Sequence, residues 1–419
     1  MIEKIKNKIN SQEKKQLVSN FFSLSVLQIV TYILPLITLP YLVRILGTET
    51  FGLVMFAQAF LIFFNIFVDF GFNLSATREI AIHRDNQTKV TEIFSAVMTI
   101  KLILILGSFV ILSFLVFIFD KFSSDWQLYF LSFLWVIGQA LFPIWYFQGM
   151  EKMKYITIVN ITSRIIFTLL IFLVIQKESD YIYVPLVNGL GFIIGGLISL
   201  WIIHKEFNQS FTLCNISTLK HYFYESSQFF WSRISLTLYT SSNAFILGIF
   251  TNNTMVGYYS IAEKLYQAMQ QIYQPIVQAL YPYVAKHKNI KLFKKIFTFS
   301  IVVNILGIIL LFFIGPYIFD LLFTANIGEE SLNVFYILLL AAIVVVPSIL
   351  LGYPYLGALG FAKYANSSVI YGSIFHLVGL GVLILLHKVN IYNVAFLVIA
   401  TEVLVFSIRV YWIKRKALW

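Results

Sequence analysis

The chain contains little charge and a single cysteine, and each shortage excludes a class of protein. Asp, Glu, Lys and Arg make up 12% of its 419 residues, against roughly 25% in typical soluble domains. Cys214 alone permits neither an internal disulfide nor a multi-cysteine metal site, so we interpret it as an inert thiol. No phosphate-binding P-loop motif occurs, so the chain is not expected to use ATP directly.

Much of the chain consists of long apolar stretches. Hydrophobic residues make up 59% of the chain, and its mean hydropathy is +0.84. A membrane helix needs about 20 mainly apolar residues, and twelve stretches meet this requirement. The predicted spans are 17–43, 51–76, 93–119, 127–148, 156–175, 182–203, 226–250, 255–283, 296–319, 332–356, 367–387 and 393–413. The predicted fold class is an all-α integral membrane protein with about twelve transmembrane helices.

The positive charges orient these spans. Twenty-one of the thirty lysines and arginines lie in the two termini and the even-numbered loops, and only four lie in the odd-numbered loops. This bias predicts that both termini are cytoplasmic. The cations flank apolar spans and form no single basic stripe, so nucleic acid is not an expected partner. The predicted parts are basic tails at 1–16 and 414–419, six-helix lobes at 17–205 and 226–413, and a cytoplasmic linker at 206–225.

Two short motifs indicate that the lobes are repeats. Pro143-x5-Gly149-x2-Lys152 recurs as Pro354-x5-Gly360-x2-Lys363, and Gly52-x4-Ala57 recurs as Gly257-x4-Ala262. The offsets are 211 and 205 residues, and the motifs lie in equivalent spans of the two halves. Because each half has an even number of spans, the halves have the same orientation. The prediction is two parallel lobes around a central cavity, an arrangement typical of transporters.

Polar side chains recur at helical spacing inside several spans. Such side chains face the bundle interior or a wet cavity, because lipid cannot hydrogen-bond to them. The candidates for a substrate cavity are Gln28, Asn65, Arg164, Arg233, Lys264, Gln267, Gln270 and Gln274. The alternative is that some of these residues only form hydrogen bonds between helices.

Charged residues within the spans indicate the type of substrate and a candidate coupling ion. We expect Lys101 and Arg409 to snorkel toward the membrane surface, whereas Arg164 and Arg233 lie deeper. Asp69, Glu263 and Glu402 are candidates for pairing with cations or for binding a proton or sodium ion that drives transport. No other cofactor and no metal are expected. The five cations Lys101, Arg164, Arg233, Lys264 and Arg409 outnumber these three acids, which favours an anionic substrate.

Several motifs also resemble polysaccharide-unit flippases of the Wzx type. They are Leu39-Pro-Tyr-Leu-Val-Arg44, Phe51-Gly52, Asp69-Phe-Gly71, Thr77-Arg78-Glu79, Trp145-Tyr-Phe-Gln148-Gly149 and Val256-Gly257-Tyr258-Tyr259-x2-Ala262-Glu263-Lys264. This superfamily also contains multidrug and toxic-compound extruders and the lipid II flippase. Arg44 and Arg78 match motif positions at span ends, and with Pro35 and Pro275 they are candidates for gating or orientation.

The resemblance implies a substrate, a mechanism and a location. The substrate is an undecaprenyl-diphosphate-linked oligosaccharide, which the family moves by alternating access across the bacterial cytoplasmic membrane for O-antigen or capsule assembly. Membrane lipids are partners, and a polysaccharide polymerase and a chain-length regulator are candidate partners. A cation-coupled exporter of small molecules on the same fold is the alternative. An enzyme is not expected, because the outer loops are only a few residues long.

Overall fold

The computed structural model describes the backbone of residues 2–323 and 325–419. Side chains are described from Leu34 onward, except at positions 232, 235, 236, 239, 240, 279 and 324–327. Every regular element of this described part is helical. The elements are α1 (Ile2–Asp69), α2 (Phe72–His83), α3 (Gln87–Ile118), α4 (Asp120–Ser123), α5 (Trp126–Leu141), α6 (Ile144–Gly149), α7 (Met153–Val174), η1 (Glu178–Ile182), α8 (Tyr183–Phe207), α9 (Ile216–Phe250), α10 (Asn253–Gln271), α11 (Gln274–His287), α12 (Ile290–Leu322), α13 (Ala325–Leu351), η2 (Gly352–Gly357), α14 (Ala362–Leu385) and α15 (Ile391–Arg415).

The helices confirm an all-α membrane fold but leave the number of spans a prediction. Within the described residues, nine helical stretches are long and apolar enough to cross a membrane. One of them, Leu34–His83, contains parts of two predicted spans. The predicted spans 226–250 and 255–283 fall on α9, α10 and α11 and are not among the nine. The part of α9 that is described without interruption, Ser241–Phe250, is a shorter apolar helix. Polar residues such as Glu263, Gln267 and Gln270 lower the hydropathy of α10.

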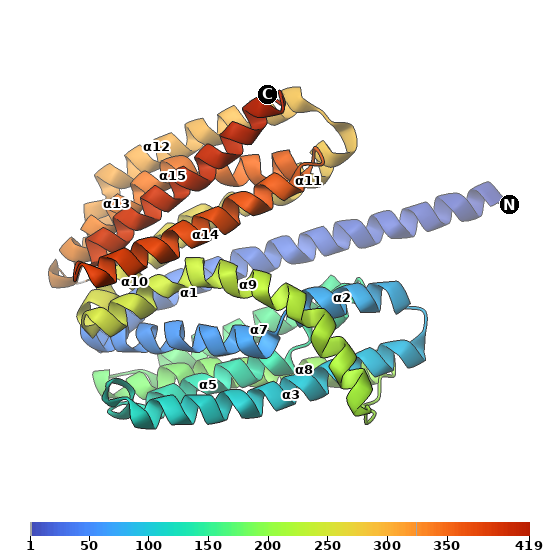
Figure 1. The fold of residues 1–419 in the computed structure, drawn as a ribbon, viewed down its shortest axis with the longest axis horizontal. Helices are drawn as coiled ribbons and strands as arrows, with labels where there is room; N and C mark the ends of the chain where they lie inside the picture. The colour runs from blue at the N-terminus through green and yellow to red at the C-terminus, as the bar shows by residue number, and fades with distance from the viewer. Residues whose placement is uncertain (1, 324) are drawn as a thin grey trace. The chain divides into compact units, whose positions relative to one another are not determined.

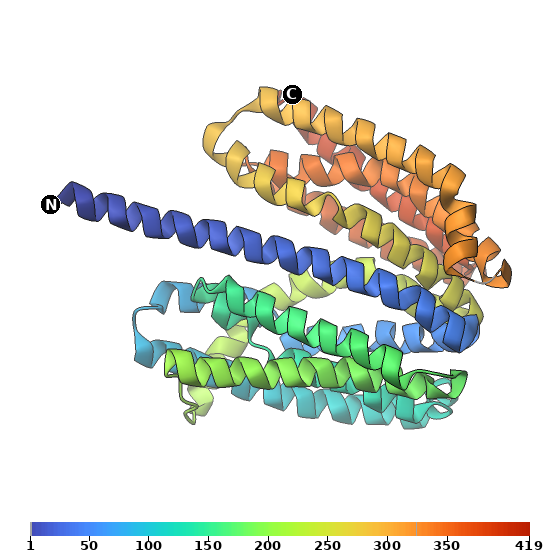
Figure 2. The same ribbon diagram turned by 180° about the vertical axis from the view of Figure 1, so that it is seen from behind.

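Glycines mark two sharp changes of chain direction. Gly47 has a φ of 71°, and α1 bends there, so its two arms are the first two predicted spans (Figures 1 and 2). Gly71, with a φ of 82°, separates α1 from α2. A Cβ atom at Gly71 would lie 2.8 Å from the Cβ of Phe229, so the position requires glycine for its conformation and for its space.

The chain divides into two compact units that do not follow a simple cut in the sequence. Unit 1 contains Met1–Thr38 and Phe60–Ile234, and unit 2 contains Leu39–Ala59 and Ser235–Trp419. The turn between the first two predicted spans therefore packs with the C-terminal helices. The start of α9 packs with the N-terminal helices.

Small residues allow the helices of unit 1 to approach closely. Gly138 on α5 faces Phe192 and Ile193 on α8, and a Cβ there would lie 2.6 Å from the Cβ of Phe192. Gly189 on α8 faces Leu134 in the same way, at 2.5 Å. Lipid supplies no hydrophobic force between membrane helices, so close packing of this kind holds them together.

Two of the cations predicted to snorkel are buried, and that expectation was wrong for both. Lys101 in unit 1 has 3% of its surface exposed, and its Nζ lies 3.5 Å from Oδ1 of Asp69. Arg409 in unit 2 is 8% exposed. Its Nε donates to the hydroxyl of Ser368 at 2.9 Å, and its Nη1 donates to the hydroxyl of Ser348 at 3.0 Å. Polar groups inside the bundle hold these side chains, so they do not reach the membrane surface.

The residues of one repeated motif contact each other within unit 2. A Cβ atom at Gly52 would lie 1.8 Å from the carbonyl oxygen of Asn253. A Cβ atom at Gly257 would lie 2.3 Å from the carbonyl oxygen of Thr48. Gly52 and Gly257 are 205 residues apart, and so are Thr48 and Asn253. Each glycine therefore contacts the residue that lies four positions before the other glycine. Reciprocal contacts of this kind are characteristic of two-fold symmetry, and we name these four residues the reciprocal contact.

Candidate functional site

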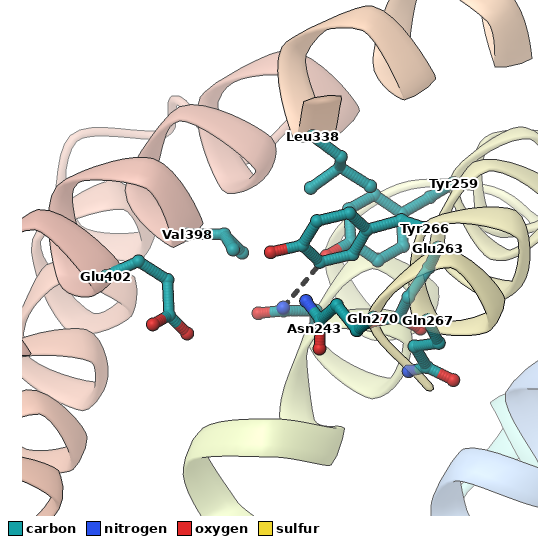
Figure 3. Close-up of a pocket in the computed structure, with 9 residues that line it drawn as sticks. All are labelled: Asn243, Tyr259, Glu263, Tyr266, Gln267, Gln270, Leu338, Val398 and Glu402. Carbon is teal, nitrogen blue, oxygen red and sulfur yellow. Dashed lines mark hydrogen bonds between the residues drawn. The ribbon is translucent and has the colours of Figure 1, made fainter. Parts of the chain in front are cut away.

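A small polar cavity lies within unit 2, between residues of α9, α10, α13 and α15 (Figure 3). Its volume is about 110 Å³. The lining residues are Asn243, Tyr259, Glu263, Tyr266, Gln267, Gln270, Leu338, Val398 and Glu402. Those from α10 recur every three or four positions and therefore share one face of that helix. The predicted polar stripe thus faces a cavity over part of its length.

A buried hydrogen-bonded network continues from this cavity. The Nδ2 of Asn243 donates to the Tyr259 hydroxyl at 2.8 Å. The Oδ1 of Asn243 lies 2.9 Å from Nε2 of His376, whose side chain is completely buried. The Nδ1 of His376 lies 3.0 Å from the hydroxyl oxygen of Thr401. Four helices, α9, α10, α14 and α15, contribute to this network.

The network can accommodate the imidazole with either one or two protons. The amide oxygen of Asn243 accepts from the Nε2–H of His376 in both states. In the neutral state, the Thr401 hydroxyl donates to Nδ1. When Nδ1 is protonated it becomes a donor, and the same hydroxyl turns to the Leu397 carbonyl, 2.8 Å away. A single hydroxyl rotation therefore keeps every ring nitrogen bonded.

The charged side chains that line this cavity are acidic, and the net positive interior predicted between the two lobes is a separate prediction. Glu263 and Glu402 line it, and no lysine or arginine is among the lining residues given above. Glu263 and Glu402, predicted to pair with cations or bind a coupling ion, therefore line the same cavity as Gln267 and Gln270, predicted to bind substrate. Both roles stay predictions.

The other predicted substrate residues are distributed over both units. Asn65, Arg164 and Arg233 belong to unit 1, and Arg233 is exposed although it lies in the seventh predicted span. Lys264 and Gln274 belong to unit 2 and are half-buried, but neither is among the residues that line the cavity. The side chain of Gln28 lies outside the described residues.

The gating candidates differ in what they contact. Arg44 donates to the backbone carbonyls of Leu321 and Leu322, the latter from Nε at 2.9 Å. These carbonyls belong to the last two residues of α12, where a cation also interacts favourably with the helix dipole. Pro275 lies in the first turn of α11, where proline is tolerated, so it does not bend the interior of a helix. Pro35 and Arg78 are exposed on α1 and α2.

Comparison with known proteins identifies the family. The family model described as "Polysaccharide biosynthesis protein" matches residues 17–288. The chain belongs to this family. The predicted resemblance is thereby confirmed at the level of the family.

Two curated relatives of this chain carry the description "Putative O-antigen transporter". The one from Escherichia coli (strain K12) is 33% identical over 273 residues, which cover 65% of this chain and 66% of the relative. The chain thus matches just under two thirds of that relative. The other, from Shigella dysenteriae, is 28% identical over 302 residues and covers 71% of this chain and 75% of the relative.

Solved structures share the fold of this family member. "Lipid II flippase MurJ, inward closed conformation" matches with a TM-score of 0.71 at 12% identity, and covers 95% of this chain and 87% of that one. An inward-facing multidrug resistance MATE family transporter of the MOP superfamily matches with a TM-score of 0.66 at 11% identity. That match covers 91% of this chain and 94% of the other. At this identity the likeness establishes the fold alone.

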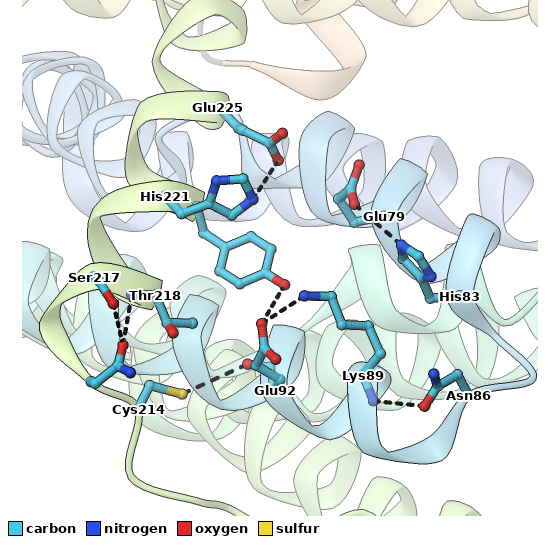
Figure 4. Close-up of polar contacts among 12 residues, drawn as sticks. Glu79, His83, Asn86, Lys89, Glu92, Cys214, Ser217, Thr218, His221 and Glu225 are labelled. Carbon is cyan, nitrogen blue, oxygen red and sulfur yellow. Dashed lines mark hydrogen bonds and ion pairs between the residues drawn. The ribbon is translucent and has the colours of Figure 1, made fainter.

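Residues of the predicted linker are fixed to α3 by polar contacts (Figure 4). The hydroxyl of Tyr222 donates to Glu92 at 3.0 Å, and the Nζ of Lys89 lies 2.8 Å from the same carboxylate. Burial raises the pKa of Tyr222 to about 12, so its hydroxyl stays protonated as a donor. Burial and the charge of Glu92 raise the pKa of Cys214, which keeps the thiol protonated and agrees with an inert role.

Proposed function

We propose that this protein moves an undecaprenyl-diphosphate-linked oligosaccharide across the bacterial cytoplasmic membrane. Membership of the polysaccharide biosynthesis family carries the proposal, and the relatives' descriptions support it. A sugar headgroup cannot cross about 30 Å of hydrocarbon without a polar path. Exposed Arg233 offers a bidentate partner for diphosphate within a predicted span. Translocation of this kind requires no covalent chemistry, and the polymerase and chain-length regulator remain candidate partners.

The proposed mechanism is alternating access, with the reciprocal contact at the outer side. The charge bias assigns Thr48 and Asn253 to outer loops, and both termini to the cytoplasm. The reciprocal contact and the bonds of Arg44 hold the turn between the first two spans on C-terminal helices. Because all of these residues belong to unit 2, the turn would keep its place on unit 2 during the cycle.

The orientation can be tested with one introduced cysteine. In a Cys214→Ser background, a membrane-impermeant maleimide should label Ser210→Cys, at an exposed position of the linker, in inverted vesicles and not in intact spheroplasts. Cys214→Ser alone is the control for labelling of other proteins. Equal labelling from the outside would contradict the proposed topology.

Substitutions at Arg233 test the substrate site. Arg233→Ala should abolish surface polysaccharide and cause lipid-linked oligosaccharide to accumulate, while the protein remains inserted in the membrane. Arg233→Lys should retain part of the activity if charge is what matters. Lys177→Ala, which removes one exposed cation from an outer loop, should behave as wild type. Normal polysaccharide in the Arg233→Ala strain would remove Arg233 from the site.

We further propose that a proton drives the cycle and that His376, in the buried network beside the polar cavity, binds it. Glu263 and Glu402 line the cavity, and His376 belongs to the buried network that Asn243 and Tyr259 connect to it. Glu263 follows Tyr259 by one helical turn, so the cavity carboxylate and the buried network share one face of α10. The two hydrogen-bonded states of His376 allow a proton to be held or released without an unsatisfied ring nitrogen.

The proton proposal predicts a specific loss in proteoliposomes. His376→Gln keeps a polar group but cannot titrate, so substrate-dependent proton uptake should disappear. Thr401→Val removes one hydroxyl and should weaken the uptake while leaving it measurable. Replacing sodium with choline should change neither result. Transport by His376→Gln that keeps its dependence on the proton gradient would overturn the proposal.

The acidic lining of the cavity also favours the second candidate function, a cation-coupled exporter of small molecules. Dye efflux from cells separates the two candidates. A flippase should give no dye efflux above that of a strain lacking the protein. Efflux that depends on Glu263 and Glu402 would favour the exporter.

A further inference from the structure

A second cavity is lined mainly by apolar side chains, in contrast to the polar cavity described above. Its volume is about 220 Å³, and it lies in unit 2 among residues of α12, α13 and α15. The lining residues are Phe297, Leu351, Phe406, Val410, Ile413, Lys414 and Trp419. Apart from Lys414 and the indole N–H of Trp419, these side chains carry only carbon and hydrogen. The cavity therefore suits a hydrocarbon chain.

The end of the chain forms one wall of this cavity. Trp419 packs edge-on against Phe297 and Tyr355, with ring centroids 5.3 and 5.7 Å apart. The Tyr355 hydroxyl donates to the backbone carbonyl of Leu418. The Nζ of Lys294 lies 4.8 Å from the centre of the Trp419 ring. These contacts hold Trp419 in place, while 53% of its surface stays exposed.

Cations surround the same end of unit 2. One buried apolar cluster contains Val284, Phe293, Tyr355, Ala365 and Ile413, and so joins the end of α11, the start of α12, η2, the start of α14 and the end of α15. Figure 1 shows the C-terminus beside the connection between α11 and α12. The cations on these segments are Lys286, Lys288, Lys291, Lys294, Lys295, Lys363, Lys414, Arg415 and Lys416. Segments 281–298, 352–366 and 403–419 contain no Asp or Glu.

We propose that this cavity binds an anionic glycerophospholipid, with an acyl chain against Phe406 and Val410 and the phosphate at Lys414 and Lys294. Basic pockets between membrane helices on the cytoplasmic side recognise anionic headgroups, and the charge bias assigns this end to that side. A tryptophan with an apolar body and a polar N–H is suited to the boundary between chain and headgroup. The lining offers no set of hydrogen-bonding groups for a sugar, so the ligand is a phospholipid and not the lipid-linked oligosaccharide.

Trp419 provides the probe for the experiment. The full-length protein is reconstituted in phosphatidylcholine vesicles containing a small mole fraction of phosphatidylglycerol brominated on its acyl chains, which quenches nearby tryptophan. The same titration on Trp419→Phe isolates the contribution of Trp419. We expect brominated phosphatidylglycerol to quench this contribution at a mole fraction roughly tenfold lower than brominated phosphatidylcholine.

Paired variants separate the charge from the cavity. Lys294→Gln/Lys414→Gln should abolish the preference for phosphatidylglycerol. Val410→Phe should fill the cavity and reduce quenching by both lipids. Ile413→Phe serves the same purpose if Val410→Phe lowers the melting temperature. Lys152→Gln/Lys154→Gln removes two cations from an inner loop of unit 1 and should leave quenching unchanged.

Two results would overturn the proposal. Equal quenching by the two brominated lipids would show that the cavity contacts bulk lipid without selecting charge. Displacement of brominated phosphatidylglycerol by polyprenyl phosphate, but not by unlabelled phosphatidylglycerol, would assign the cavity to the transported lipid. The experiment measures lipid binding and not transport, so its result is independent of the proposed transport function.

Discussion

Lys101 in unit 1 and Arg409 in unit 2 are both buried positive charges, and the two units stabilise them with different kinds of partner. Both are cations on long apolar helices, and both are almost completely buried. In unit 1 the ammonium of Lys101 lies 3.5 Å from the carboxylate of Asp69. In unit 2 the guanidinium of Arg409 donates to the hydroxyls of Ser348 and Ser368.

The difference follows from the geometry of the two cations. An ammonium is a compact point charge that one carboxylate can neutralise, whereas a planar guanidinium has five donors and can use several neutral acceptors. Gly352 makes room for the guanidinium, because a Cβ there would lie 3.1 Å from Nη1 of Arg409. Loss of a partner should therefore cost more at Lys101 than at Arg409.

The largest effect is expected from Asp69→Asn. This change leaves the Lys101 ammonium buried without its carboxylate, which costs about 3–5 kcal/mol when a buried pair is broken. A fall in melting temperature in detergent and a fall in the amount of inserted protein would measure this loss. The double variant Asp69→Asn/Lys101→Met should recover most of the stability. A stable Asp69→Asn single variant would show that the pair does not hold unit 1 together.

A smaller effect is expected from Arg409→Lys. Lysine keeps the charge but cannot direct donors to Ser348 and Ser368 together, so about 1–3 kcal/mol of hydrogen bonding is lost. The same melting experiment should show a shift smaller than that of Asp69→Asn. A larger shift would reverse the comparison between the two units.

The smallest effect is expected from Gly352→Ala. The added methyl group would lie 3.1 Å from the Arg409 guanidinium, so the side chain must shift by a few tenths of an ångström. Crowding of this degree costs about 1 kcal/mol. Gly381→Ala is the matched control on α14, because a Cβ there has open space. Equal melting temperatures for the two variants would show that Arg409 accommodates the methyl group freely.

Short-range patterns in the sequence predicted the all-α membrane class, the family resemblance and one face of the cavity. Hydropathy, loop charge and helical spacing are local properties, and the structure shows Glu263 and Gln267 on one face of α10 as that spacing implies. The burial of Lys101 and Arg409 was not predictable in this way. It depends on partners such as Asp69 and Ser348, which only the packing of helices brings near.

The network around His376 was missed for a related reason. The polar residues that share the buried face of α14 with His376 are the serines Ser368 and Ser373, so no stripe of charged or amide side chains marks it. Asn243, which bonds to it, lies 133 residues earlier in the chain. A lone buried histidine in a predicted span was the available signal, because an ionisable side chain in lipid needs a partner.

The reciprocal contact has a consequence for how the two halves of this chain can change over time. A larger residue at Gly52 would collide with Asn253, four residues before the other copy of the motif, and a larger residue at Gly257 would collide with Thr48. Duplication ordinarily frees one copy to drift while the other retains the original role. Here the two copies are each other's binding surface, so each restricts the mutations that the other can accept.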